Sequence, residues 1–322
     1  RNFILPDQMP YTTASGTTYD CGDFARNMDD AMIAADWAGF EARRADAAKR
    51  RRMRGIGMST YVEICGFDQE EATLRFIEDG TLEVLIGTQS SGQGHETAYA
   101  QIAADGLGIP IEQVKVVQGD TDVIPFGKGT GGSRSLPVGG PALQNAVDAL
   151  IDRGKVFASH LLQARRNEIR FADGQFTVTG SGRAMGITQL ARAARHMENL
   201  PPGEMMAELR AVARFKIKAS TFPNGCHICE LEIDPETGAV ELAAYYVVDD
   251  FGTIVNPLLL TGQVRGGVVQ GIGQALMEET VYDRDTAQLL SASFLDYAVP
   301  HAFQTPPMQV DYNSIPCTTN PL

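Results

Sequence analysis

Cysteine and tryptophan are scarce in this 322-residue sequence, which holds five cysteines and one tryptophan. The cysteines are spread along the chain, at Cys21, Cys65, Cys226, Cys229 and Cys317. A disulfide-stabilised secreted scaffold needs a denser set, so the low count favours a reducing compartment and predicts a cytoplasmic protein. No apolar run approaches the roughly 20 residues of a membrane-spanning helix, and no secretory signal is visible, so we expect no membrane span.

Basic charge is also in short supply. The chain has 27 Lys and Arg against 40 Asp and Glu, which gives a net charge of −13. This excess of negative charge repels a phosphate backbone and excludes nucleic acid as the expected partner. It does not forbid a local anion site, which needs only a few donors and a helix end. The apolar fraction of 43% argues against disorder, and the length suggests two domains or one bilobed domain.

Hydrophobic spacing and turn residues predict helices alternating with short strands. We expect helices over residues 24–49, 97–107, 141–165 and 261–279. We expect strands over 55–62, 73–77, 82–87, 114–118, 228–233 and 240–248, and a hairpin over 168–179.

The order strand pair, glycine–glutamine turn, helix occurs twice, over residues 73–107 and 228–279. This order suggests an internal structural repeat, in which Gln93 and Gln263 hold related positions and approach one ligand from two sides. The alternative is that hairpin, loop and helix simply form a common arrangement. Residues 199–210 contain two prolines and a glycine, which indicates a surface loop and a domain boundary near it.

A first glycine-rich turn precedes the helix expected over 97–107. Its residues are Ser91, Gly92, Gln93, Gly94 and His95. Glycine lets backbone N–H groups approach a ligand closely, and a helix start adds free N–H donors with a partial positive charge. The side chain of Gln93 can both donate and accept, which suits a heterocycle or a phosphate ester. A plain turn with a helix cap is the alternative.

A second glycine-rich turn precedes the helix expected over 141–165. The residues that we take as its binding set are Thr130, Gly131, Gly132, Ser133, Arg134 and Ser135. Such a run of glycines, hydroxyls and cations can hold several anionic oxygens. It is not a P-loop, because Gly129 replaces the Ser or Thr after Lys128 and Asp122 replaces the first glycine. Neither turn has the Rossmann glycine spacing.

Three other features have weaker functional interpretations. Asp120 and Asp122 suggest a metal site, but Asx-turn residues are the more common explanation. His95 can donate to a phosphate or cap its helix locally. Cys226 and Cys229 form a C-x-x-C that lacks a second pair and enters a predicted strand, where positions three apart face opposite sides. We therefore predict no protein metal ligands.

Four ordered stretches together resemble the large subunits of molybdenum hydroxylases, the family of xanthine dehydrogenase, aldehyde oxidoreductase and aerobic carbon monoxide dehydrogenase. The stretches cover residues 91–97, 119–122, 129–135 and 249–271, and their spacing is most similar to the carbon monoxide dehydrogenase branch. The resemblance implies a molybdopterin cofactor with molybdenum, in its cytosine dinucleotide form. It also implies that Gly92 and Gln93 lie beside the metal centre, that Thr130 to Ser135 bind the pterin and its phosphate side, and that Gln263 bonds the cofactor from a second lobe.

The resemblance further implies hydroxylation of an aldehyde, an N-heterocycle or carbon monoxide with oxygen taken from water, and general-base catalysis by a glutamate. That glutamate follows an Asn-Pro stretch in the family, and this sequence ends at Asn320-Pro321-Leu322. Glu63, Glu96 and Glu278 do not fit the position, so no catalytic residue is predicted. We expect a fragment of a large subunit that is inactive by itself. A non-catalytic cofactor-binding or cofactor-handling module is the alternative.

The implied partners are the remainder of the large subunit, subunits or domains with [2Fe-2S] clusters and FAD, a small-molecule substrate and a second copy of the holoenzyme. The predicted fold is α+β, of the aldehyde oxidase and xanthine dehydrogenase molybdopterin-binding type, with two lobes of small mixed sheets packed with helices. We expect a tail of a preceding domain over 1–52, a first lobe over 53–205 and a second lobe over 206–322.

Overall fold

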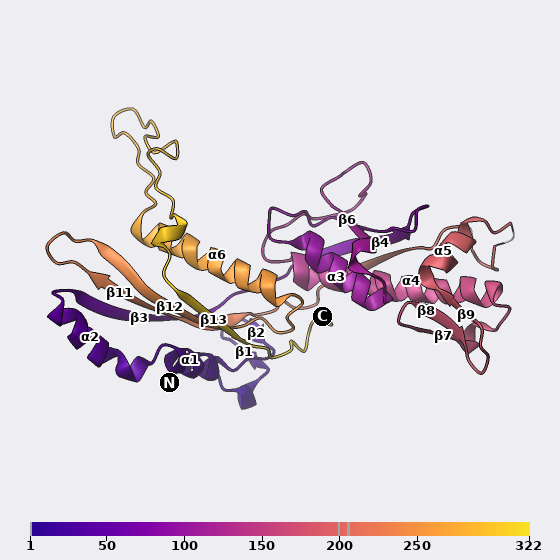
Figure 1. Cartoon of the computed structure of the whole chain (residues 1–322), viewed down its shortest axis with the longest axis horizontal. Helices are drawn as coiled ribbons and strands as arrows, with labels where there is room; N and C mark the ends of the chain where they lie inside the picture. Colours follow the sequence, from indigo (N-terminus) through magenta and orange to yellow (C-terminus); the bar gives the residue numbers. More distant parts are fainter. Residues whose placement is uncertain (1, 199, 205–206) are drawn as a thin grey trace. The chain divides into compact units, whose positions relative to one another are not determined.

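The computed structural model describes residues 2–198, 200–204 and 207–322. It divides into two compact units, one formed by residues 1–63 with 222–316 and the other by 64–221 with 317–322. Both units combine helices with small mixed sheets, so the predicted α+β class is confirmed (Figure 1). In the described part of the chain, no helix is long and apolar enough to cross a membrane.

The first unit is built on one four-stranded sheet with the order β13-β12-β11-β3. The strands are β3 (Met53–Val62), β11 (Asn224–Ile233), β12 (Val240–Asp250) and β13 (Met308–Asn313). Only the β12–β13 pair is parallel. A short hairpin of β1 (Tyr11–Thr12) and β2 (Thr18–Tyr19) precedes the first helix.

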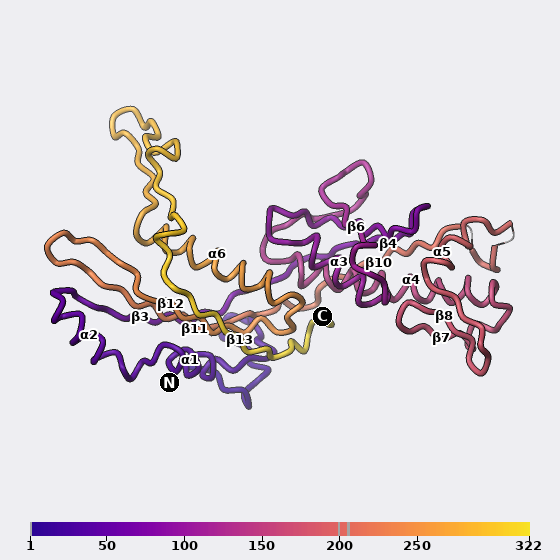
Figure 2. The backbone as a smooth tube through the Cα atoms, viewed as in Figure 1, coloured from indigo at the N-terminus to yellow at the C-terminus, as the bar shows by residue number. Residues whose placement is uncertain are grey.

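Helices cover both faces of this sheet, as the tube in Figure 2 also shows. On one face, Ala31 and Ala35 of the α1 region (Phe24–Ala34) pack against Cys226, Ile228 and Val248. On the other face, Val268 and Ile272 of α6 (Pro257–Leu276) pack against Val247. The alternation along β12 explains why one strand can face two helix layers, because the successive side chains of Val247 and Val248 point to opposite sides.

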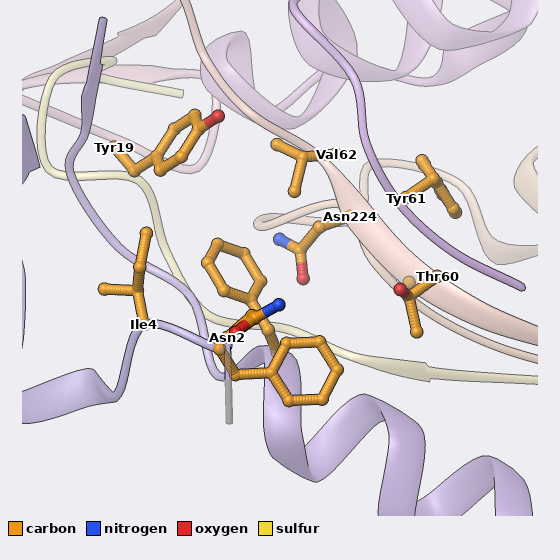
Figure 3. A pocket seen from close by; sticks show the side chains of 10 residues that line it. Asn2, Ile4, Tyr19, Thr60, Tyr61, Val62 and Asn224 are labelled. Carbon is orange, nitrogen blue, oxygen red and sulfur yellow. The ribbon is translucent and has the colours of Figure 1, made fainter. Parts of the chain in front are cut away.

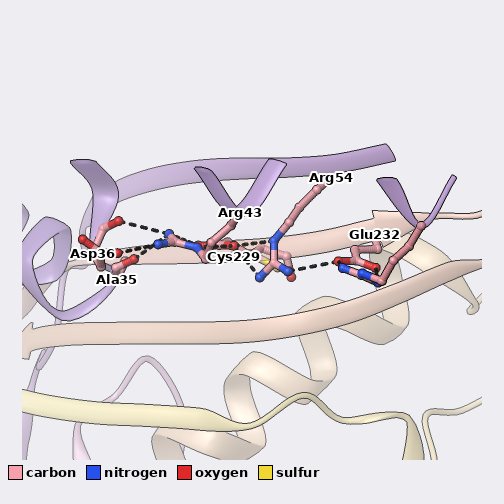
Figure 4. Close-up of polar contacts among 8 residues, drawn as sticks. Ala35, Asp36, Arg43, Arg54, Cys229 and Glu232 are labelled. Carbon is pink, nitrogen blue, oxygen red and sulfur yellow. Dashed lines mark hydrogen bonds and ion pairs between the residues drawn. The ribbon is translucent and has the colours of Figure 1, made fainter. Parts of the chain in front are cut away.

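Ion pairs fix α2 (Phe40–Lys49) to strand β11 of the same sheet. Arg43 and Arg54 both pair with Glu230, whose side chain is 1% exposed, and Arg54 also pairs with Glu232 (Figure 4). Arg50 gives Glu232 a second partner. Burying a carboxylate is costly unless charged donors surround it, so these contacts position α2 as well as stabilise it.

The second unit contains two sheets. The first has the order β10-β4-β5-β6, with β10 (Arg210–Lys216), β4 (Gln69–Phe76), β5 (Leu82–Ile86) and β6 (Val114–Val117). The second consists of β7 (Ile169–Ala172), β8 (Gln175–Val178) and β9 (Ala184–Gly186). Its helices are α3 (His95–Leu107), α4 (Gly140–Leu161) and α5 (Ile187–Arg195).

Helix α4 forms the centre of the second unit. Leu143, Val147, Leu150 and Phe157 are completely buried on one face, at the helical spacing that the sequence predicted. Gly154 brings α4 close to the second sheet, because a Cβ there would lie 2.3 Å from the ring of Phe176. A π-helical turn, Ser135–Gly139, leads into α4, so the second glycine-rich turn does open a helix.

The single helix expected over 24–49 is wrong. Two helices, α1 and α2, are separated by a short 3-10 segment over Trp37–Gly39. Asp36 adopts a left-handed conformation with φ of 43°, which a helix cannot continue through. The Asp36 carboxylate then packs against the backbone of Gly39, where a side chain has no room, since a Cβ there would lie 2.0 Å from that carboxylate.

The glycine–glutamine turn expected before the last helix is also wrong. Helix α6 begins at Pro257, with the Asn256 side chain accepting from the N–H of Leu259, so Gly262 and Gln263 lie inside the helix. The Asn-Pro pair supplies both a cap and a first residue that needs no N–H partner. The second copy of the turn is therefore missing, but the rest of the predicted internal repeat is present. In both four-stranded sheets an antiparallel strand pair is followed by a helix and by a strand parallel to the second strand, as β4, β5, α3 and β6 and as β11, β12, α6 and β13.

The two compact units have different bounds from the three domains expected over residues 1–52, 53–205 and 206–322. Residues 1–52 belong with 53–63 because α1 and β3 both pack on β11, and β10 belongs with the second unit because it pairs with β4. The expected boundary between residues 205 and 206 lies outside the described residues, as does part of the predicted loop over 199–210.

Candidate functional site

The first glycine-rich turn leads directly into α3. Gly92 and Gly94 have φ values of +102° and +84°, a backbone region that favours glycine. Gly94 is the residue before the helix, and the first intrahelical bond runs from the N–H of Ala98 to its carbonyl. The N–H groups of the first helical residues therefore have no intrahelical acceptor, and they carry the partial positive charge of a helix start.

Local hydrogen bonds shape this turn. The Gln93 side-chain oxygen accepts from the N–H of Ser91 at 2.5 Å and from the Ser90 hydroxyl at 3.4 Å, so the local bonds of this side chain use its oxygen. The ring of His95 is 7% exposed, and its Nδ1 lies 3.3 Å from the Thr88 carbonyl oxygen. Of the two roles considered for His95, this contact favours the local one.

The second glycine-rich turn is folded around two charged side chains that are completely buried, Arg134 and Glu70 of β4. The guanidinium of Arg134 lies 2.8 Å from the Glu70 carboxylate and also donates to the carbonyl oxygens of Gly129 at 2.7 Å and Gln69 at 2.6 Å. Glu70 accepts from the N–H of Lys128 as well. The side chain of Arg134 thus points into the protein and stabilises the turn from within.

The structure brings the two turns together within the second unit. The hydroxyl of Thr130 donates to the carbonyl oxygen of Gln89 at 2.6 Å. The backbones of Gly87 and Gly127 pack directly against each other, since a Cβ on Gly87 would lie 2.2 Å from the Cα of Gly127. A substitution at either glycine would push the two segments apart, so their contact depends on both.

Tyr99 of α3 joins the bases of the two turns. Its hydroxyl lies 2.7 Å from Thr88 Oγ1, before the first turn, and donates to the carbonyl oxygen of Ser135, at the end of the second, at 2.9 Å. The side chain is 1% exposed, and burial raises the pKa of Tyr99 well above its usual range. Tyr99 therefore acts as a neutral hydrogen-bonding bridge, not as an acid or base.

The other predicted binding residues form one accessible surface. Ser91, Gly92, Thr130, Gly131, Gly132 and Ser133 are exposed, while Gln93, Gly94 and Ser135 are half-buried. A Cβ on Gly92 or Gly131 would meet no atom within 4 Å, so open space lies above both turns. Gly132 is different, because a Cβ there would lie 2.3 Å from the Phe67 ring.

This surface offers hydroxyls, an amide donor and backbone N–H groups beside a helix start. Such a set recognises a polar heterocycle or an anionic group without needing a net positive charge. Gln263 lies exposed on α6 of the other compact unit, so its contact with the same ligand stays a prediction.

The other chemical motifs have structural roles. Asp120 accepts from the N–H of Asp122 at 3.0 Å, the pattern of an Asx turn. Across the described residues, no group of three or more His, Cys, Asp or Glu could hold a metal ion. Cys226 is buried and Cys229 half-buried along β11, and burial is the main cause that raises the pKa of Cys226 to about 11. Such a thiol is unreactive at neutral pH.

A separate hollow of about 230 Å³ lies in the first unit (Figure 3). It is lined by Asn2, Phe3, Ile4, Tyr19, Phe24, Thr60, Tyr61, Val62, Asn224 and Gly225. None of the residues predicted to bind a cofactor contributes to it.

Sequence reasoning missed Glu70 and Tyr99. Glu70 is 64 positions from Arg134 and sits in a strand, so nothing local marks it as the partner of a distant cation. Its position in the helix predicts that Tyr99 belongs to an apolar stripe, and its burial fits that position. Its hydroxyl gave no separate signal, although a buried tyrosine usually finds a hydrogen-bond partner.

Comparison with known proteins shows to which family the chain belongs. Residues 30–306 match the family described as molybdopterin cofactor-binding domain. The carbon monoxide dehydrogenase large chain of Afipia carboxidovorans is 34% identical over 346 residues, which cover 100% of this chain and 42% of that one. The nicotine 6-hydroxylase large subunit of Paenarthrobacter nicotinovorans is 32% identical, over 96% of this chain and 40% of that one.

The fold is similar to that of a solved oxidoreductase. The crystal structure of quinoline 2-oxidoreductase from Pseudomonas putida 86 matches with a TM-score of 0.89 and 32% identity, over 100% of this chain and 42% of that chain. This chain thus spans about two fifths of the length of the curated relatives that it matches. On the match over most of its length, the chain belongs to the molybdopterin cofactor-binding domain family, as its four sequence motifs predicted.

Proposed function

We propose that this chain is the molybdopterin-binding part of the large subunit of an oxidoreductase. The observation that carries the proposal is the contact between the two glycine-rich turns at the start of α3, held by Thr130 and Tyr99. It presents the predicted binding residues on one open surface in a chain of the molybdopterin cofactor-binding family. Relatives named as carbon monoxide dehydrogenase and nicotine 6-hydroxylase large subunits support the activity class.

The residues of this surface fit the cofactor by their chemistry. A pterin presents heterocyclic donors and acceptors, and its side chain ends in phosphate. Gln93 and the N–H groups at the start of α3 supply donors, the hydroxyls of Ser91 and Ser133 supply adaptable partners, and Gly92 and Gly131 leave room for close approach. When bound, the cofactor supplies the redox-active molybdenum. The chain supplies its binding, its orientation and the rigid base made by Glu70 and Arg134.

The finer parts of the proposal concern ligands and partners. The cofactor takes the cytosine dinucleotide form, with the exposed residues Thr130 to Ser133 on its phosphate side and Gln263 as a further contact. The Arg134 side chain, which the sequence predicted as a ligand, supports these residues from below because it is completely buried. The substrate is an aldehyde, an N-heterocycle or carbon monoxide, hydroxylated or oxidised with oxygen from water. Electrons leave through [2Fe-2S] and FAD partners, and the rest of the large subunit supplies the catalytic glutamate.

The experiment uses the large subunit, produced with its partner subunits in a host that makes molybdopterin. Molybdenum content is measured per subunit, and an artificial electron acceptor is offered with an aldehyde, an N-heterocycle or carbon monoxide. We expect bound molybdenum and acceptor reduction with one substrate class. A preparation from a host that cannot make molybdopterin is the control. A subunit without molybdenum, or one that is loaded but reduces the acceptor with none of the three classes, would overturn the proposal.

A further inference from the structure

A long segment without regular helix or strand connects α6 to β13 in the first unit. It covers residues 277–307, which we call the arm, and Figure 1 shows it rising away from the end of α6 and returning to the sheet. Apart from one isolated bridge between Tyr282 and Leu289 and a 3-10 turn over Ala302–Gln304, it has no element of its own. Loops of this length within a compact unit are uncommon and are usually functional.

The arm exposes large apolar side chains to an unusual degree. Phe294 is 88% exposed, Leu295 is 96% exposed and Phe303 is 84% exposed. Leu290 and Val299 add further exposed apolar surface along the same segment. None of these side chains belongs to the two apolar clusters described for the first unit. Single exposed apolar residues are ordinary, but a concentration like this marks an interaction surface.

Charge is nearly absent where the exposed side chains concentrate. From Ser291 to Phe303 the only Asp, Glu, Lys or Arg is Asp296, and its carboxylate accepts from the Ser293 hydroxyl. The hydrogen bonds of the arm are mostly local, and Tyr297 holds the base of the arm by donating to Glu278, two residues after the end of α6. The arm therefore keeps a defined shape while its apolar side chains face outward.

We propose that the arm is a docking surface for polypeptide of the same large subunit that lies outside this chain. The inference rests on the proposed function, and it names the surface of this chain that the rest of the large subunit covers. More than half of the length of the matched carbon monoxide dehydrogenase large chain lies outside the region that this chain matches, which supplies enough polypeptide to cover the arm. A second copy fits less well, because both copies carry a net charge of −13. The covering surface is uncharged and apolar, with pockets that accept Phe294 and Leu295.

Hydroxyl-radical footprinting tests this inference on the isolated chain and on the assembled large subunit. We expect Phe294, Leu295 and Phe303 to be oxidised about tenfold more slowly in the subunit, because side chains that are almost fully exposed become buried interface residues there. Oxidation rates that are equal in the two samples would overturn the inference. Protection that already occurs in the isolated chain and rises with its concentration would assign the arm to a second copy, and would also overturn it.

Substitution supplies a second readout. Leu295→Asp should lower the melting temperature of the large subunit but not that of the isolated chain, where this side chain has almost no contacts to lose. Ile33→Asp is the matched control, because Ile33 is a similarly exposed apolar residue, 77% exposed, on α1. A melting temperature of the subunit that Leu295→Asp leaves unchanged would contradict docking.

The two proposals fail in different ways. A subunit that protects the arm but holds no molybdenum refutes the proposed function alone. A loaded and active subunit whose arm reacts as fast as that of the isolated chain refutes docking alone.

Discussion

Two neighbouring glutamates in β4 show how burial changes what an ion pair contributes. Glu70 and its partner Arg134 have completely buried side chains, whereas Glu71 pairs with Arg214, whose side chain is 58% exposed. In the first pair neither charge can be solvated, so each needs the other. In the second pair water can replace a lost partner at small cost.

Glu70→Gln should therefore destabilise the chain far more than Glu71→Gln. The first change leaves the buried guanidinium of Arg134 without a counter-charge, which costs about 3–5 kcal/mol of unfolding free energy. The second removes a partly exposed pair, which costs about 1 kcal/mol or less. Urea denaturation followed by circular dichroism measures both. Similar midpoints for the two variants would show that Arg134 finds another partner and that Glu70 does not organise the second turn.

The same residues show where sequence reasoning reaches its limit. The glycines and hydroxyls of both turns could be identified from local pattern alone, since backbone freedom and helix starts are local properties. The direction of the Arg134 side chain could not. It depends on a glutamate 64 positions away and on carbonyls that face inward only once β4 is in place.

At the scale of elements, α6 is notable for its glycines. It contains Gly262, Gly266, Gly267, Gly271 and Gly273 within 20 residues. A Cβ on the first four would meet no atom within 4 Å, whereas one on Gly273 would lie 2.2 Å from Glu278 and 2.9 Å from Pro300. Glycine inside a helix loses more backbone entropy on folding than alanine does, so these positions weaken the isolated helix.

Gly266→Ala should stabilise the isolated chain by about 0.5–1 kcal/mol, because the added methyl group meets open space and lowers the entropy of the unfolded chain. Gly273→Ala, in the same helix, should destabilise it, because Pro300 at the base of the arm must move. The comparison of the two melting temperatures is the check. Two shifts of the same sign would mean that α6 is not packed as described.

Elements with strong periodicity were predicted well, and those defined by a single residue were not. The strands that became β3, β4, β5 and β6 and helices α3 and α4 follow from spacing and turn residues. The break at Asp36 does not, because most residues around it favour a helix. Asn256-Pro257 is a local signal for the start of α6, but Gly262-Gln263 resembles the first turn and indicates a later start.

At the scale of the whole molecule, long-range strand pairing decides which residues belong together. β3 pairs with β11 across more than 160 positions, and β10 pairs with β4 across more than 130. Composition and loop residues mark where a chain can be cut, but pairing partners are a property of the folded sheet. This is why the class and the mixed sheets could be predicted while the bounds of the compact units could not.

The central claim is that the open surface over the two glycine-rich turns binds molybdopterin. The most direct test compares the molybdenum and pterin content of two variants of the large subunit. Gly131→Val places a side chain in the open space above the second turn, whereas Gly182→Val places one in equally open space between β8 and β9.

Neither glycine has a positive φ, so both substitutions should leave the fold and the melting temperature unchanged. We expect Gly131→Val to lose most of its molybdenum and pterin and Gly182→Val to retain both at the level of the unsubstituted subunit. Full cofactor content in Gly131→Val would contradict the account.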